Sequence, residues 1–411
     1  MLHARRTWGI LIAVFAAVAL LAASCTGSDD GSEVREIGES SGSVSGSASG
    51  SGSASGSASA SGTHTGSASG SASASGTHTG SASGSASAPA GSDSGMTPGD
   101  GGYEYASNVD SHRLVVADIC GIGDLLDAGD FAAVDDIYRN GKNSVKSDGS
   151  IRTIGGFASR DDRSHGHDAY YGTATPLDDF VSAALDGTGM FSGTSDAVRG
   201  QGVEKGIQNQ VMVAWVVHEL DAALAKAADG NFDAASGAPH NWDEAWAFYH
   251  GAEPGCAPYA TANKRAGNFA TMGADGETAR ANEAILAAMI EGRDALLDGD
   301  RASTEAAALE IVRNLVITYS QAAIRYASLI EGDLADGNDA KAAEHQAEGL
   351  AFWRVIEPYA VPAGADAAAM SAILDLSNAP GANGYGDAVR AALQPAWTAL
   401  GISADDIGTL Q

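Results

Sequence analysis

The segment HNWDEAWAFYHG, residues 240–251, gathers two histidines, two carboxylates and four aromatic side chains. Imidazole nitrogens and carboxylate oxygens are common metal ligands, and acids also suit the first turn of a helix, where the helix dipole favours negative charge. At helical spacing His240, Asp243 and His250 share one face. The segment therefore predicts either a ligand-bearing helix or an ordinary helix with capping acids and surface histidines. Its candidate metal ligands are His240, Asp243, Glu244 and His250.

A second candidate region is QNQVMVAWVVHELDAAL, residues 208–224. Apolar residues surround this predicted helix on most sides, which is typical of a buried helix. His218, Glu219 and Asp221 nevertheless lie in its middle, and buried acids are rare unless they are paired or bind a metal. His218 and Glu219 are therefore candidate metal ligands. The alternative is a histidine–carboxylate pair within a polar seam.

Two tyrosines extend the candidate set, because phenolate oxygen is a good donor for ferric iron, a hard cation. Tyr319 lies on the apolar stripe of IVRNLVITYSQAAIRYASLI, and Tyr170 lies in the turn-rich segment RSHGHDAYYG. Packing in the core is the alternative for Tyr319. A loop placed on a rigid scaffold often carries function, which favours Tyr170.

Lys264 and Arg265 are conspicuous in so acidic a sequence. They are candidates to hold an anion, for example carbonate completing a metal shell, and the alternative is a salt bridge at a helix end. Residues 101–411 contain no GxSxG, HExxH, Walker, Rossmann or CxxC motif. We therefore assign no catalytic residue.

The chain of 411 residues has a formal net charge of −29, which excludes nucleic acid and anionic membrane surfaces as partners. Residues 1–25 read as a signal peptide that ends in LLAASC, so that Cys25 would be lipidated. An ordinary signal peptide cleaved nearby is the alternative. Residues 26–100, rich in Ser, Gly, Ala and Thr, predict a disordered linker. Residues 101–411 form the predicted folded domain.

Helical patterns dominate this domain, which predicts an all-α fold of antiparallel helical hairpins. Four segments share one turn pattern, in which a helix ends, Gly follows, and Asp or Asn caps the next helix. These segments are LDAGDFAA, ADGNFDAA, LDGDRAS and LADGNDAKAA. Cys120 and Cys256 are a plausible disulfide in an exported protein, and two separate buried thiols are the alternative. The predicted helices span residues 115–127, 130–139, 178–185, 195–228, 241–249, 276–297, 302–331, 338–357, 366–376 and 386–399.

Six motifs occur in one order through the domain: IYRNGKNS, RTIGGFA, AYYGT, VVHELDAAL, HNWDEAWAFYHG and NKRAGNFAT. Together they resemble the Fea1-type, low iron-inducible periplasmic proteins, to which the algal phytotransferrins look related. The resemblance implies a helical extracytoplasmic domain linked to iron assimilation, with ferric iron as ligand and carbonate as a candidate co-ligand. It does not assign ligand positions.

The sequence thus favours an exported, lipid-anchored protein at the outer face of a cell membrane that captures iron and presents it to a transporter. Two other classes stay open. One is a metal-dependent extracytoplasmic enzyme, which would need an open coordination position and a general base. The other is a non-catalytic surface or adhesion module whose acidity serves only solubility.

Overall fold

The computed structural model describes residues 97–163, 166–380 and 384–411. The predicted signal peptide, Cys25 and nearly all of the predicted linker lie outside the described residues. The described residues form helices and isolated β-bridges without a sheet, which confirms the predicted all-α fold. The helices are α2 (Asp110–Arg113), η2 (Leu114–Asp118), α3 (Ile122–Asp127), α4 (Phe131–Asn140), α5 (Ile154–Ala158), α6 (His167–Tyr171), α7 (Pro176–Asp186), η3 (Gly189–Phe191), α8 (Asp196–Lys205), η4 (Gly206–Val211), α9 (Met212–Ala228), α10 (Ala238–Tyr249), η5 (Pro254–Cys256), α11 (Pro258–Phe269), α12 (Arg280–Asp298), α13 (Arg301–Ala335), α14 (Asp339–Ala360), α15 (Ala367–Leu374), α16 (Tyr385–Ala399) and α17 (Ala404–Ile407).

Three of the four repeated turns have the predicted form. In the turn from α12 to α13, Gly299 adopts a left-handed φ of 74°, and Asp300 accepts hydrogen bonds from the first backbone N–H groups of α13. The turns before α4 and α14 follow the same pattern with Asp130 and Asn338 as caps. Because Gly avoids the steric cost of this conformation, each helix ends and the next begins within a few residues.

The fourth turn, between α9 and α10, differs from the prediction. Gly230 is left-handed as expected, but the next residues form a loop rather than a helix start. The carboxylate of Asp233 accepts backbone hydrogen bonds from Ala235 and Ser236, and thus stabilises a local turn within the loop. Helix α10 begins only after Gly237, with Pro239 in its first turn.

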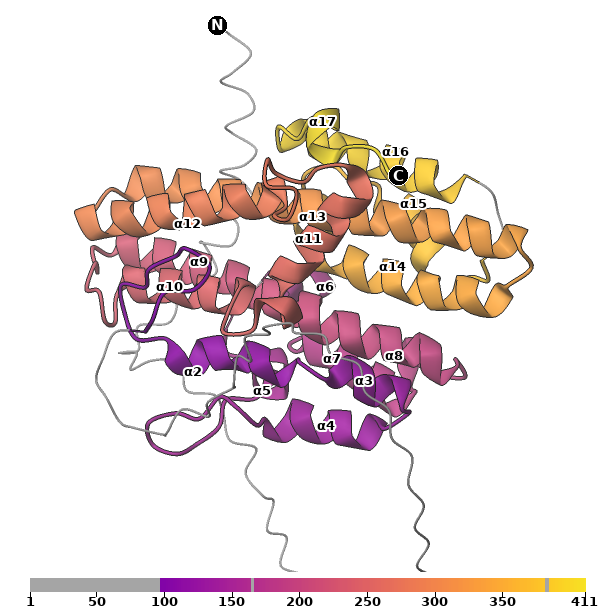
Figure 1. Ribbon diagram of the computed structural model, residues 1–411, viewed down its shortest axis with the longest axis horizontal. Coiled ribbons are helices and arrows are strands. Elements are labelled where there is room, and N and C mark those ends of the chain that lie inside the picture. Colours follow the sequence, from indigo (N-terminus) through magenta and orange to yellow (C-terminus); the bar gives the residue numbers. More distant parts are fainter. Residues whose placement is uncertain (1–96, 164–165, 381–383) are drawn as a thin grey trace, which may run out of the picture. The chain divides into compact units, whose positions relative to one another are not determined.

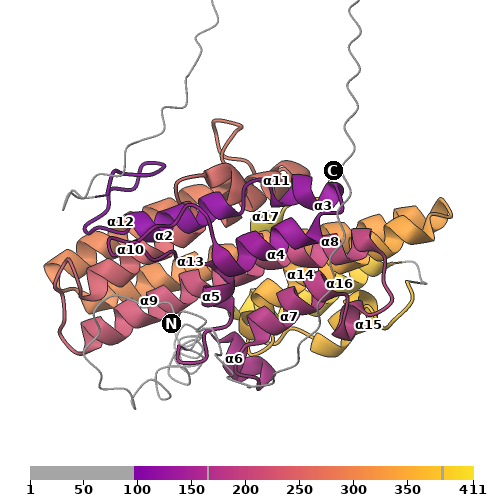
Figure 2. The ribbon, with the colours of Figure 1, turned by 90° about the horizontal axis from the view of Figure 1, so that it is seen from below.

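The helices pack in tiers around a continuous apolar core (Figure 1). Helix α13 packs against α12 and α14, and α9 and α10 pack together beneath α12. The short helix α2 lies against α10, and Figure 2 shows α2 and α4 crossing the face of the longer helices. The tryptophans anchor this arrangement, and those that are fully buried are Trp215, Trp242, Trp246, Trp353 and Trp397.

One close approach fixes α10 against α12. A Cβ added to Gly292 of α12 would lie 2.0 Å from the Trp242 ring, so only glycine allows this spacing. The Trp242 indole N–H donates to the Met289 carbonyl oxygen at 2.8 Å. These contacts hold the first half of α10 in one rotation about its axis.

A π-helical turn, η4, joins α8 to α9 without a break, so residues 196–228 run as one helix. Such turns insert an extra residue into a helix and recur at functional sites. Every residue of η4 is buried, including the polar Gln208, Asn209 and Gln210.

A disulfide joins Cys120, just after η2, to Cys256 in η5, with the two Cα atoms 5.3 Å apart. It spans 136 residues of sequence and ties the segment that contains α2 to the segment that follows α10. None of the helices in the described part of the chain is both long and apolar enough to cross a membrane.

Candidate functional site

Helices α2, α9 and α10 bring five polar side chains together in the core. We call this cluster the histidine–glutamate centre, and its members are His112, Glu219, His240, Asn241 and Glu244. His240 and Glu244 lie one turn apart on α10, Glu219 comes from α9, and His112 comes from α2. Because α9 and α10 pack along their length and α2 lies across α10, residues far apart in sequence meet at one point.

Glu244 is the focus of the centre. Its Oε1 atom lies 3.1 Å from Nε2 of His112 and 3.1 Å from Nε2 of His240. Only 1 % of Glu244 is exposed, and within the described residues no well-aligned hydrogen bond reaches Oε1. A buried carboxylate oxygen thus lies between two imidazole nitrogens without a hydrogen bond of good geometry, although such atoms are normally hydrogen-bonded.

Asn241 links the two carboxyl groups. Its Nδ2 donates to Glu219 Oε2 at 2.6 Å and makes a longer contact of 3.4 Å with Glu244 Oε2. Its own carbonyl oxygen, Oδ1, is buried and accepts no hydrogen bond. The centre therefore contains two buried acceptor atoms that lack a donor.

The two carboxyl groups have opposite protonation preferences. Burial, the negative charge of Glu244 and a hydrogen bond with Glu244 hold the pKa of Glu219 well above its usual range. Burial also acts to raise the pKa of Glu244, but attraction to His112 and His240 outweighs it, and that pKa is lowered. Glu219 thus keeps its proton and donates it toward an ionised Glu244.

The two histidines also differ. Burial lowers the pKa of His112 to about 3 despite attraction to Glu244, so its ring is neutral at physiological pH. Phe248 packs against the His112 ring with a centroid distance of 5.8 Å, and Phe157 lies nearby. For His240, burial acts to lower the pKa, but the close contact with the negatively charged Glu244 prevails and raises it.

A second network orients His240. Tyr103 and Ser107 donate to the two carboxylate oxygens of Asp243, each at 2.7 Å. Because the Ser107 proton is directed to Asp243, the Ser107 oxygen accepts from Nδ1 of His240 at 2.9 Å. His240 Nδ1 therefore carries a proton, and its Nε2 faces Glu244. This is the arrangement in which an outer hydrogen bond fixes the tautomer of a ligating histidine.

Arg152 is one of the cations that perturb the centre, where its charge acts to lower the pKa of His112. It is 6 % exposed, and its Nε donates to the Ser111 hydroxyl at 3.0 Å. Burial lowers the pKa of Arg152, and attraction to Glu244 and Glu219 opposes that effect. An anion that approached the centre would therefore meet this guanidinium.

His240 and Asn241 are the partly exposed members of the centre. The side chain of His240 is 14 % exposed, whereas those of His112 and Glu244 are 3 % and 1 % exposed. Most of the centre is therefore shielded from water. Low water content strengthens electrostatic interactions within such a site.

The structure brings together three of the sequence-predicted metal ligands, Glu219, His240 and Glu244, and it places Asp243 beside them through Ser107. His218 is adjacent to Glu219 in sequence, but its ring packs on Trp215 with a centroid distance of 4.7 Å. His250 lies at the far end of α10 and is stacked on Trp246.

The remaining predicted residues make other contacts. The Tyr170 hydroxyl donates to Glu357 at 3.0 Å, and the Tyr319 hydroxyl donates to Asn209 at 2.9 Å. Lys264 is exposed, whereas Arg265 is buried against the ring of Tyr326. These residues come from α6, α11 and α13, not from the helices that carry the centre.

Sequence reasoning missed His112, Asn241 and Arg152. His112 lies on a helix of four residues, too short for a periodic pattern to reveal which side is buried. Arg152 lies in RTIGGFA, one of the motifs that carry the family resemblance, which was the one available signal.

Within residues 97–163, 166–380 and 384–411, no three His, Cys, Asp or Glu side chains could hold a metal ion as they stand. Two contacts at Glu244 have a separation that also occurs between two ligands of one metal ion. Two ligands at right angles, each about 2.1 Å from an ion, lie about 3 Å apart, which matches the separations at Glu244 Oε1. Imidazole and carboxylate donors suit iron among the first-row metals.

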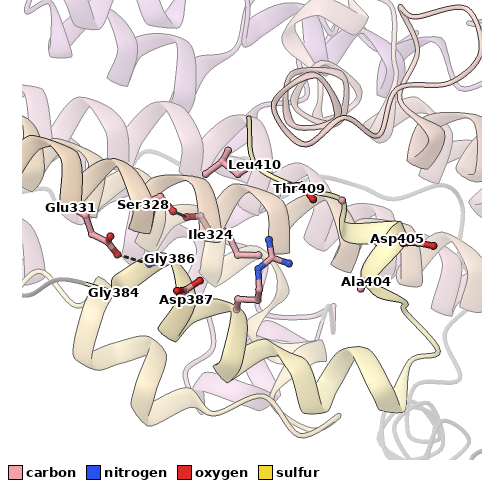
Figure 3. A pocket seen from close by; sticks show the side chains of 12 residues that line it. Ile324, Ser328, Glu331, Gly384, Gly386, Asp387, Ala404, Asp405, Thr409 and Leu410 are labelled. Carbon is pink, nitrogen blue, oxygen red and sulfur yellow. Dashed lines mark hydrogen bonds between the residues drawn. The ribbon is translucent and has the colours of Figure 1, made fainter.

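A solvent-accessible pocket of about 540 Å³ lies elsewhere, between α13, α16 and the C-terminal residues (Figure 3). Glu331 accepts a hydrogen bond from the Gly386 backbone N–H at its rim, and Asp387 and Asp405 also line it. None of its lining residues belongs to the histidine–glutamate centre.

The family model described as low iron-inducible periplasmic protein, Fea1, matches residues 78–411. No curated protein and no solved structure matches the chain.

Proposed function

The chain belongs to the Fea1 family of low iron-inducible periplasmic proteins, and from that premise we propose that it binds ferric iron at the histidine–glutamate centre for iron assimilation. One observation carries the proposal. Glu244 Oε1 is a buried acceptor with two imidazole nitrogens 3.1 Å away and no aligned hydrogen bond. A cation would satisfy this oxygen and both nitrogens at once.

In this proposal His112, His240 and Glu244 are the first ligands, and Glu219 completes the set after losing its proton. His112 needs no deprotonation, because its pKa is already lowered to about 3. Glu219 and His240 have raised pKa values, so iron would displace protons from them. Affinity should therefore increase with pH until hydroxide competes for the metal.

Carbonate enters the proposal as a co-ligand. Lys264 and Arg265 were the sequence-based candidates to hold it, but Arg152 is a cation that interacts with both Glu244 and Glu219. We therefore assign the carbonate contact to Arg152. The anion would balance part of the charge that the ion brings into a buried site.

The proposal also covers location and delivery. A lipidated Cys25 would anchor the protein at the outer face of a membrane, and the Ser/Gly-rich segment would leave the domain free to meet an iron transporter. Mass spectrometry of the exported protein tests the anchor. A mature N-terminus without lipid at Cys25 contradicts that part alone.

Equilibrium dialysis of the full-length protein against Fe³⁺ buffered by a weak chelator, with and without bicarbonate, tests the binding. We expect one ion per chain, and at least tenfold weaker affinity in His112→Gln. His218→Gln is the matched control, because this neighbour of Glu219 packs on Trp215, and its affinity should stay within twofold. Absence of stoichiometric binding under both conditions, or equal losses in the two variants, overturns the proposal.

A further inference from the structure

A second polar region lies in the core where α8, η4, α11, α13 and α14 meet. Its residues form two layers, which we call the asparagine layer and the arginine layer. The asparagine layer is Asn209, Thr261 and Tyr319; the arginine layer is Lys205, Arg265, Tyr326 and Glu348. Neither layer includes a residue of the histidine–glutamate centre.

The asparagine layer is closed by hydrogen bonds to one atom. Oδ1 of Asn209 accepts from the Thr261 hydroxyl at 2.8 Å and from the Tyr319 hydroxyl at 2.9 Å. Asn209 is fully buried, and these two bonds fix the orientation of its amide. Its Nδ2 group therefore points away from both hydroxyls, and it donates to no atom of the described protein.

On two helices, the residues of the arginine layer lie one helical turn from the residues of the asparagine layer. Arg265 is four residues beyond Thr261 on α11, and Lys205 is four residues before Asn209 on the α8–η4 helix. Four residues correspond to a rise of about 6 Å. Phe352 of α14 contacts the rings of both Tyr319 and Tyr326, at 6.0 Å and 5.4 Å between centroids. The two layers are therefore neighbours along the same stack of helices.

Arg265 is the unsatisfied member of its layer. Its guanidinium carbon lies 5.4 Å from the centre of the Tyr326 ring, and it hydrogen-bonds Tyr326. Only 7 % of Arg265 is exposed, yet its Nε and Nη1 atoms are buried and make no hydrogen bond within the described residues. The nearby Glu348 interacts instead with Tyr326 and with Lys205, whose Nζ is 3.9 Å away.

All of these unsatisfied atoms are donors. A buried N–H group without an acceptor costs about 1–3 kcal/mol, and more when the group is charged. Asn209 contributes one such nitrogen and Arg265 contributes two, whereas the charge of Lys205 is paired with Glu204 at 2.7 Å. Such a set recognises an atom group with several acceptor oxygens and a negative charge.

We propose that Arg265 and Asn209 bind a small inorganic oxyanion, of the size of phosphate, sulfate or bicarbonate, independently of any metal. Both side chains donate to its oxygens through the nitrogens that lack an acceptor within the described residues. The ligand is small because the residues of both layers around it are at most 8 % exposed, apart from Lys205. The inference does not depend on iron binding at the histidine–glutamate centre.

Thermal unfolding and calorimetric titration of the metal-free, full-length protein test this site. The probes are sodium phosphate, sodium sulfate and sodium bicarbonate, each compared with sodium chloride at equal ionic strength. We expect at least one oxyanion to raise Tm in a saturable manner and to titrate with one site per chain. Arg265→Gln should weaken that binding at least tenfold.

Lys264→Gln is the matched control, because it removes the same charge from the adjacent but exposed position of α11. Its oxyanion affinity should stay within twofold of wild type. Equal losses in the two variants would show that the effect is general screening, and they would overturn the site. So would the lack of any saturable oxyanion effect in wild type, which would assign the unsatisfied donors to internal water.

Asn209→Asp keeps the test decisive if Arg265→Gln does not fold. It preserves the acceptor for Thr261 and Tyr319 and replaces the Nδ2 donor with a carboxylate oxygen near Arg265. We expect this variant to unfold at a higher Tm in chloride and to lose its response to oxyanions. A retained response contradicts the proposal, as does oxyanion binding by wild type that occurs only with Fe³⁺, since that pattern identifies a metal co-ligand.

Discussion

The histidine–glutamate centre and the paired asparagine and arginine layers are both polar regions inside an otherwise apolar helical core, but their unsatisfied atoms have opposite character. In the centre the atoms that lack a partner include two acceptors, Glu244 Oε1 and Asn241 Oδ1. In the layers they are donors, on Arg265 and Asn209. The comparison teaches that the charge of a missing ligand can be inferred from the unpaired atoms. Buried acceptors without a donor favour a cation, and buried donors without an acceptor favour an anion.

The two regions also differ in how the chain builds them. The centre needs the short helix α2 and the N-terminal segment with Ser107, which reach α10 across a gap of more than a hundred residues. The layers are built from long helices that pack side by side. The centre should therefore be sensitive to changes that loosen the N-terminal segment, whereas the layers should not.

Removal of the disulfide is the change for which we expect the largest effect on this difference between the two regions. Cys120→Ala with Cys256→Ala should lower the free energy of unfolding by about 4–5 kcal/mol in the chain-entropy description of a loop of this length. Iron affinity should fall with it, because the bond ties down the segment that carries His112. Urea unfolding and dialysis measure the two effects. Oxyanion binding reduced as much as iron binding would contradict the comparison.

Glu244→Gln tests the charge of the centre at nearly constant shape. We expect iron affinity to fall at least a hundredfold, about 2.7 kcal/mol, because the carboxylate is the shared partner of both histidines. Glu348→Gln is the matched control in the arginine layer and should leave iron affinity within twofold. Dialysis against chelator-buffered Fe³⁺ measures both variants. Similar losses of iron affinity in the two variants would show that iron binding depends on the total buried charge of the core and not on Glu244 in particular.

Ser107→Ala tests the outer network. Without the hydroxyl, Nδ1 of His240 loses its acceptor, and the imidazole can change tautomer or rotate. Loss of such an outer partner typically costs about tenfold or more in metal affinity. We expect a tenfold loss in dialysis, with little change in Tm in the absence of metal. A full hundredfold loss would mean that Ser107 holds the backbone of the site as well as the ring.

The pH dependence of stability gives the smallest and most specific test. The pKa of Glu348 is raised by burial, against the attraction of Lys205, so the folded state favours its protonated form. Its contribution is therefore lost as pH increases from about 4.5 through the raised value, by at most about 1.4 kcal/mol per unit. Glu348→Gln should become more stable relative to wild type over that range, as measured by urea unfolding.

Glu244 has the opposite sign. Its pKa is lowered, so its contribution is present above about 4.5 and is lost as pH falls through the lowered value. The stability difference between Glu244→Gln and wild type should therefore shrink in acid. The same pH trend in both variants would contradict the assigned protonation states.

The helical hairpins could be predicted because their signals are local. Gly299 and Asp300 show where one helix ends and the next begins, whatever the rest of the chain does. Helix α11 was not predicted, because its buried side carries Thr261, Ala262 and Arg265 rather than a stripe of large apolar residues. A helix that packs through small and polar residues has no strong hydrophobic period.

The candidate site could be predicted in part for the same reason. His240 and Glu244 share a helix, and Glu219 lies in a clearly buried one, so local patterns find them. His112 joins them only through tertiary packing, against Phe157 and Phe248. No spacing in the sequence contains that contact, and the apolar setting that keeps His112 neutral is visible only in the fold.

The π-helical turn at residues 206–211 has a consequence for how this chain can evolve. Asn209 and Glu219 lie on the same uninterrupted helix, and each serves a different polar region. Deleting one residue from that turn would restore ordinary α-helical geometry, and α8 and α9 would stay near their present orientations because the π-turn absorbs one extra residue. Asn209 lies in the turn and Glu219 lies beyond it, so a single-codon deletion there would disrupt the asparagine layer and leave Glu219 in register. The turn is thus a point at which the two regions can be inherited separately.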